Sequence, residues 1–192
     1  MGGTTLPAML KTNQALLTAD DYRDLPEGPP HFQLVEGKLF MTPSPEFYHQ
    51  SVALNIASLI RYYLREHPLG KVAIAPSDVQ FDFVNVHQPD VYFISNERLG
   101  ILTKQGPVGA PDLVVEVLSR STARLDRGPK LRVYARSGVK ELWLVDKERK
   151  EVAVYRFAES IQEPVATLRG KQKLTTPLLP GLKLVLTEVF EE

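Results

Sequence analysis

Two acidic residues stand in apolar surroundings where a carboxylate can do chemistry. Asp90 follows Pro89 and opens the apolar run 91–94, and a carboxylate at the start of a strand suits a cleft better than a core. Glu116 lies inside the apolar run 113–118, which is predicted to be a buried strand. A buried charge is costly unless it is paired, hydrogen-bonded or bound to a metal ion. The alternatives are a solvated acid at Asp90 and a structural ion pair at Glu116.

The spacing along the second strand limits which acids can share a metal ion. Every second residue of a strand lies on one face, so Asp112 and Glu116 share a face. At ~3.3 Å per residue, their Cα atoms are separated by about 13 Å. Because oxygen ligands bind small divalent cations at ~2.1–2.5 Å, the two acids are too far apart to hold one ion. A site centred on Glu116 therefore needs another strand, and Asp90 is the best candidate.

A basic segment follows the second acid. Residues 120–140 include seven Lys or Arg residues and one acid, Asp126, in a chain of zero net charge. The three- and four-residue spacing of a helix places Lys130 on the same side as Tyr134. If this helix packs on the sheet, Lys130 reaches over the end of the strand that carries Glu116. The alternative is a solvated basic helix face.

Taken in order, these motifs resemble a bacterial family of restriction-endonuclease-like proteins in the PD-(D/E)XK nuclease superfamily. The resemblance extends from about Leu16 to Phe190, and its motifs are Pro89-Asp90, Asp112…Glu116-Val117-Leu118, a helix with Lys130 and the run from Gly138 to Asp146. It implies a restriction-endonuclease-like α/β fold, with a mixed central β-sheet flanked by helices. It also implies hydrolysis of phosphodiester bonds, with DNA as the expected substrate and Mg²⁺ or Mn²⁺ as the cofactor.

The same resemblance implies roles for individual residues. Asp90 and Glu116 match the two metal-binding acids, and the backbone carbonyl of Val117 adds a ligand. Leu118 stands where the superfamily has its lysine, so Lys130 is expected to replace that lysine from the helix. A bound cation polarises the scissile phosphate and lowers the pKa of a bound water. The lysine stabilises charge on the phosphate or helps to deprotonate the water.

Further positions are expected to support this set. Glu36 precedes Gly37 in a predicted turn, where acids are common, and the resemblance places it near the cleft. Asp112 is a supporting acid or simply the residue that opens its strand. His49 lies on an apolar helical stripe, which favours a partly buried histidine over a metal ligand. The phosphate backbone is expected to contact Arg124, Arg127, Arg132 and Arg136.

The predicted elements form one α/β domain. Residues 1–17 are expected to form a flexible arm, and residues 18–192 a single domain. Helices are predicted after the N-cap Thr18, over 46–67 and over 129–137, where Pro129 suits the first helical position and Gly138 ends the helix. Strands are predicted over 31–36, 38–42, 72–75, 79–83, 90–94, 113–118, 141–145 and 152–157. A hairpin is expected near Gly170.

Composition excludes several classes of protein. The 192 residues include no Cys, which excludes disulfides, thiol nucleophiles and Cys-ligated metal centres. The 23 basic residues balance the 23 acidic ones, which excludes a generic binder of polyanions. Apolar runs of about four residues are far shorter than the ~20 that span a bilayer, and no signal-peptide core is evident. A cytoplasmic protein without a membrane partner is expected.

Other functions stay open from the sequence. The missing lysine at Leu118 leaves room for a catalytically inactive nucleic-acid-binding protein with the nuclease fold. A metal-dependent hydrolase of a small phosphoester is a third option, but it leaves the basic segment without a role. A homodimer would suit cleavage of both strands of a duplex, because a two-fold assembly matches them.

Overall fold

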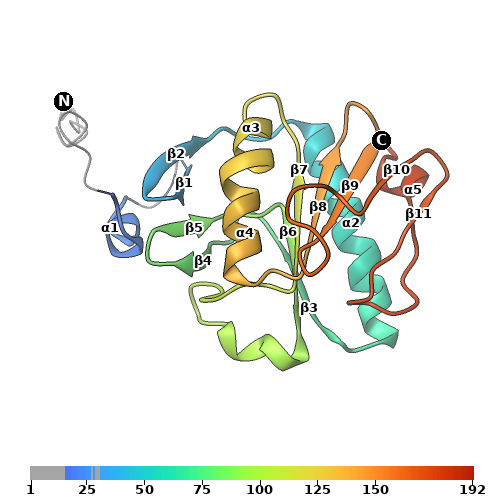
Figure 1. Cartoon of the computed structure of the whole chain (residues 1–192), viewed down its shortest axis with the longest axis horizontal. Helices are drawn as coiled ribbons and strands as arrows, with labels where there is room; N and C mark the ends of the chain where they lie inside the picture. Colours follow the sequence, from blue (N-terminus) through green and yellow to red (C-terminus); the bar gives the residue numbers. More distant parts are fainter. Residues whose placement is uncertain (1–15, 27, 29–30) are drawn as a thin grey trace.

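A six-stranded mixed β-sheet forms the centre of the computed structural model, which describes residues 16–26, 28 and 31–192 (Figure 1). The strand order is β10-β9-β8-β7-β6-β3. The strands are β3 (Gly70–Ile74), β6 (Val91–Ser95), β7 (Leu113–Val117), β8 (Glu141–Asp146), β9 (Glu151–Arg156) and β10 (Ala166–Arg169). Only β7 and β8 pair in parallel, and the other neighbours are antiparallel. The predicted mixed sheet is confirmed.

A smaller antiparallel sheet with the order β2-β1-β5-β4 lies beside the central sheet (Figure 1). Its strands are β1 (His31–Val35), β2 (Lys38–Thr42), β4 (Val79–Asp82) and β5 (Asn85–His87). The predicted turn is present between β1 and β2, where Glu36 and Gly37 have positive φ angles of 49° and 71°. Strand β5 was not predicted, because three residues are too few to show a period.

The predicted first helix is also present. Helix α1 (Ala19–Arg23) begins at the N-cap Thr18, whose hydroxyl accepts a hydrogen bond from the backbone N–H of Asp21 at 3.3 Å. Most of the arm expected over residues 1–17 lies outside the described residues. No helix in the described ranges is long and apolar enough to cross a membrane.

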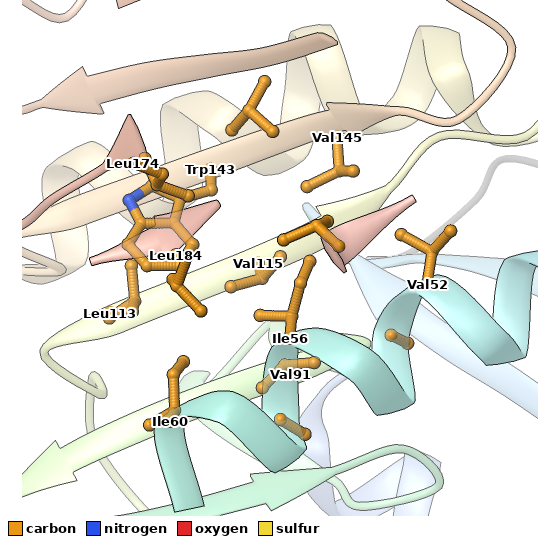
Figure 2. Packing of buried hydrophobic residues seen from close by; sticks show 14 of the residues in the cluster. Val52, Ile56, Ile60, Val91, Leu113, Val115, Trp143, Val145, Leu174 and Leu184 are labelled. Carbon is orange, nitrogen blue, oxygen red and sulfur yellow. The ribbon is translucent and has the colours of Figure 1, made fainter. Parts of the chain in front are cut away.

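Helix α2 (Phe47–Glu66) covers one face of the central sheet. Its predicted apolar stripe packs against the buried residues of β7 and β8 that point to this side, as Figure 2 shows for Val52, Ile56, Val115 and Trp143. The C-terminal elements β11 (Lys173–Leu174), β12 (Leu184–Val185) and α5 (Leu186–Val189) complete this layer. The hairpin predicted near Gly170 is wrong, because β10 pairs with β9 and β11 with β12.

A continuous helical segment covers the opposite face. It consists of α3 (Ala123–Leu125), a π-helical turn η2 (Asp126–Lys130) and α4 (Leu131–Ser137), and a 3₁₀ helix η1 (Asn96–Ile101) lies after β6. The predicted start at Pro129 is wrong, because the helix begins six residues earlier and Pro129 lies inside the π turn. Proline lacks an N–H and clashes with the preceding α-helical turn, so a wider π turn accommodates it. The predicted end is correct, since Gly138 is left-handed with φ 92°.

Candidate active site

The two candidate acids meet at one edge of the central sheet. Asp90 immediately precedes β6, and Glu116 is the penultimate residue of β7. Because these strands are antiparallel, with Val91 opposite Val115, the start of β6 lies beside the end of β7. The backbone N–H of Val117 donates a hydrogen bond to Asp90 Oδ2 at 2.7 Å. Strand pairing alone therefore brings the two acids together.

Lys130 reaches the same place from the helical segment. Its Nζ lies 2.6 Å from Glu116 Oε1 and 3.2 Å from Asp126 Oδ1, and its side chain is only 2% exposed. The π turn supplies both Lys130 and Asp126, and isolated π turns are frequent at functional sites. The ion pair considered as an alternative for Glu116 exists, and its partner is Lys130. The solvated helix face considered for Lys130 is excluded by its burial.

Two side chains that the sequence did not assign to the site contact the acids. His49 Nε2, from α2, lies 2.9 Å from Asp90 Oδ1. The Tyr134 hydroxyl, from α4, donates a hydrogen bond to Glu116 Oε1. The helices on the two faces of the sheet therefore each position one acid. The only sequence signal was a polar group on an otherwise apolar helical stripe.

A pocket of about 470 Å³ opens onto these groups. Asp90, Glu116, Asp126 and Lys130 line it. Much of the rest of its wall comes from residues 42–46, 49–50, 75–76 and 119–122 and from Lys147, and His31, Gln33, Gln88 and Val117 complete it. Its size lies within the range of small-molecule sites and suits a group as large as a nucleotide. A larger hollow of about 660 Å³ lies beside α1 but contains neither Asp90 nor Glu116.

The pocket holds more carboxylates than enclosed cations. Burial raises the pKa of Glu116, and the charges of Asp126 and Asp90 add to this effect while Lys130 opposes it. Burial also disfavours the charged form of Lys130, but the charges of Glu116 and Asp126 outweigh it and raise the pKa of Lys130. The lysine therefore stays protonated beside a surplus of acid. Such a surplus favours the binding of a divalent cation.

The oxygen donors fit a small, hard cation. Asp90 and Glu116 offer carboxylates, and Val117 also lines the pocket. Glu116 Oε1 accepts hydrogen bonds from Lys130 and Tyr134, whereas Oε2 has no such partner among the described residues. Within the same part of the chain, no cluster of three or more His, Cys, Asp or Glu side chains could ligate a metal. Mg²⁺ usually keeps several waters and binds proteins through one or two carboxylates, which matches this set.

The two supporting acids lie away from the pocket. Asp112 is at the other end of β7, where its Oδ2 accepts a hydrogen bond from the N–H of Ser95 at 2.7 Å. Glu36 lies in the turn between β1 and β2, with its carboxylate oxygens 3.4 Å from Arg132 and 3.2 Å from Arg136. Neither acid is in contact with Asp90 or Glu116.

The basic segment is mostly paired on the surface. Arg132 and Arg136 contact Glu36, and Arg127 lies 3.4 Å from Asp146. None of the four arginines expected to hold phosphate lines the pocket; Arg124 is the one without an ion pair in the described ranges. The pocket's basic residues besides Lys130 are Arg120 and Lys147, which the sequence analysis did not select. Each comes shortly after one of the two parallel strands, β7 or β8.

Comparisons with known proteins agree with this architecture. Residues 19–187 match the sequence profile of the Uma2 family, described as "Putative restriction endonuclease". No curated protein matches the chain. The crystal structure of a putative nuclease belonging to DUF820 from Anabaena variabilis is similar, with a TM-score of 0.76 and 20% sequence identity over 91% of this chain and 97% of that chain. At this identity the likeness shows a shared fold, and the expected restriction-endonuclease-like α/β fold is confirmed.

Proposed function

Because the chain belongs to the Uma2 family of putative restriction endonucleases, we propose that it hydrolyses phosphodiester bonds in DNA with Mg²⁺ or Mn²⁺ as cofactor. The observation that carries this proposal is the meeting of Asp90, Glu116 and Lys130 in one pocket. Two acids in surplus beside one protonated lysine are the groups needed to bind a divalent cation and to stabilise a phosphate.

The acids would hold the cation. Asp90 and Glu116 would provide carboxylate oxygens, and Val117 a backbone carbonyl oxygen. When bound, the cation supplies polarisation of the scissile phosphate and lowers the pKa of a bound water. His49 and Tyr134 orient the two carboxylates through the hydrogen bonds to Asp90 Oδ1 and Glu116 Oε1. Hydrogen bonds of this kind keep metal-binding carboxylates in place.

Lys130 would supply the positive charge that related enzymes carry on the strand. Leu118, which stands at that strand position, is buried in the apolar layer together with Leu131 and cannot provide it. The neighbouring acids raise the pKa of Lys130 and keep it protonated. This favours stabilisation of charge on the phosphate by Lys130 over abstraction of a proton from water.

The test is cleavage of supercoiled plasmid in Mg²⁺ or Mn²⁺. Wild type is expected to nick the plasmid, and Asp90→Ala, Glu116→Ala and Lys130→Ala are each expected to abolish nicking. Asp112→Asn, at the other end of the same strand, is the matched control and should still cut. Variants that cut as fast as wild type would refute the assigned site.

A second candidate function is favoured by one observation, the buried Leu118 at the usual lysine position. On this alternative the protein binds nucleic acid without cleaving it. Wild type would then leave the plasmid intact, bind nucleic acid equally well in EDTA, and bind Mn²⁺ with an affinity that Asp90→Ala does not change. Isothermal titration calorimetry with Mn²⁺ separates the two functions independently of cleavage.

A further inference from the structure

A second lysine lines the same pocket. Lys147 directly follows β8, which is parallel to β7, so the carboxyl ends of both strands lie at one edge of the sheet. The backbone N–H of Leu118 donates to Val145 O at 2.8 Å, which joins the segments that leave the two strands. Lys147 therefore belongs to the wall of the pocket that also holds Glu116.

Lys147 is buried, whereas the two carboxylates that pair with it are exposed to solvent. The lysine side chain is 5% exposed, whereas Glu46 and Glu148, whose oxygens lie 3.0 Å and 2.7 Å from its Nζ, are 78% and 66% exposed. Burying an ammonium group is costly without an anion, so Lys147 needs a negative partner. The two carboxylates lose little when the ion pairs open, because water replaces the lysine. The anion at Lys147 is thus exchangeable.

Lys130 differs in this respect. Its partners Glu116 and Asp126 are as buried as the lysine itself, so neither can move into solvent. The pocket therefore contains two buried lysines, of which Lys130 has buried partners and Lys147 has exposed partners that can be replaced. Only Lys147 can therefore bind an incoming anion without leaving a buried carboxylate unpaired.

Other donors surround the exchangeable cation. Arg120 lines the pocket, is exposed and forms no ion pair within the part of the chain that the structure describes. The hydrogen bond from Lys147 and, more weakly, the charge of Arg120 lower the pKa of Glu148, the residue after Lys147. Ser119, Ser121 and Thr122 line the same wall, and their hydroxyls are joined to one another by hydrogen bonds at Ser119 Oγ. Cations with hydroxyl donors form the usual environment of a bound phosphate.

We propose that Lys147, with Arg120, forms a phosphate subsite that binds the nucleic-acid backbone next to the scissile phosphate. In the free protein the carboxylate of Glu46 occupies this subsite and gives way to the phosphate. The inference rests on the proposed function, because it takes the substrate to be a polynucleotide.

The experiment measures binding of a fluorescent DNA duplex in EDTA, where no cleavage takes place, from 50 to 200 mM salt. Lys147→Met keeps the aliphatic packing and is expected to weaken binding about fivefold and to make the slope of log K against log salt shallower by about 1. Lys150→Met, an exposed lysine in the same turn, is the matched control and should leave the slope unchanged. Equal slopes for the two variants would overturn the proposal.

Glu46→Gln gives the result that a merely structural ion pair would not produce. Removing the competing carboxylate is expected to tighten DNA binding about twofold or more, and weaker or unchanged binding would overturn the proposal. This variant retains Lys147, so it remains decisive if Lys147→Met fails to fold. If wild type cleaves DNA and Lys147→Met binds DNA as tightly as wild type, the phosphate subsite is refuted but the nuclease function is not. If DNA binding depends on Lys147 but wild type does not cleave DNA, the proposed nuclease function is refuted and the phosphate subsite is not.

Discussion

The two ends of strand β7 each carry a buried acid, and their surroundings differ in charge. At the first end, burial alone would raise the pKa of Asp112, but hydrogen bonds from Lys140 and Ser95 hold it below the usual value. Arg98 adds a second cation, 3.5 Å away. At the last end, Glu116 shares Lys130 with Asp126, and its pKa is raised.

The comparison shows that burial of an acid does not by itself indicate function. Asp112 and Glu116 are of similar chemistry, on one face of one strand, and both are almost fully buried. What separates them is the balance of charge and the presence of a pocket. An acid whose charge is met by its neighbours stabilises the fold, whereas an acid in surplus facing a pocket is available to a cation or a substrate.

The largest expected difference between the two ends is in catalysis. Glu116→Gln is expected to lower plasmid cleavage at least about 100-fold, because even residues that only support a metal ligand are worth 10–100-fold. Its melting temperature should equal that of wild type at low pH and exceed it as the pH rises toward 8, because the carboxylate that ionises in wild type is absent. Asp112→Asn should cleave at nearly the wild-type rate per folded molecule but unfold at lower urea. Similar losses of cleavage in the two variants would contradict the comparison.

The next difference is in stability without metal. Lys130→Met leaves Glu116, Asp126 and Asp90 without an enclosed cation and is expected to cost about 3 kcal/mol in urea unfolding in EDTA. Addition of Mg²⁺ should recover part of this loss, because a ligand that binds only the folded state stabilises it. Lys140→Met is the matched change at the other end. It should cost less, because Arg98 remains near Asp112. Equal losses of unfolding free energy in Lys130→Met and Lys140→Met would show that nearby cations balance the charges of Glu116 and Asp112 to the same extent.

The pH dependence of stability should have opposite signs at the two ends. The folded-state pKa of Glu116, about 8, lies above the unfolded value of about 4.5, so its contribution is fully present below pH 4.5 and is lost as the pH rises to 8. The folded-state pKa of Asp112 is lowered, so its contribution is present above pH 3.8 and is lost as the pH falls further. Lys130 stays protonated throughout the range from pH 5 to pH 8.

Urea unfolding from pH 2 to pH 8 in EDTA tests these signs. Wild type is expected to lose stability with rising pH, and Glu116→Gln is expected to remove that loss. Asp112→Asn should retain the loss at neutral pH but remove the sensitivity to acid. A slope that Glu116→Gln leaves unchanged would assign the titration to another group.

The smallest expected effect concerns the orientation of Glu116. Tyr134→Phe removes the hydroxyl that donates to Glu116 Oε1 and is expected to weaken Mn²⁺ binding about tenfold in calorimetry. Tyr155→Phe, a buried tyrosine on β9, is the control and should bind Mn²⁺ as wild type does. Unchanged affinity in Tyr134→Phe would mean that Lys130 alone orients the carboxylate.

Much of the fold and part of the candidate site were predictable because their signals are local. The N-cap Thr18, the turn at Glu36 and Gly37 and the stop at Gly138 follow from the chemistry of a few adjacent residues. Glu116 was selected because an acid interrupts an apolar strand. Lys130 was selected because helical spacing places it on the side of Tyr134, at the N-terminal end of the predicted helix, and because the resemblance implies a displaced lysine there. The start of that helix was misplaced, because Pro129 occupies a π turn that no periodicity reveals.

The sequence by itself determined the types of groups available and the strand and helix that carry them. Only the tertiary structure decided which charges are balanced. Glu36 meets Arg136 across 100 positions of the chain, and His49 meets Asp90 across 41, so neither contact has a local pattern. The physical reason is that the electrostatic environment of a charged side chain depends on the groups that lie close to it in space. Strand pairing and helix packing set those neighbours, and they leave Asp112 satisfied and Glu116 in surplus.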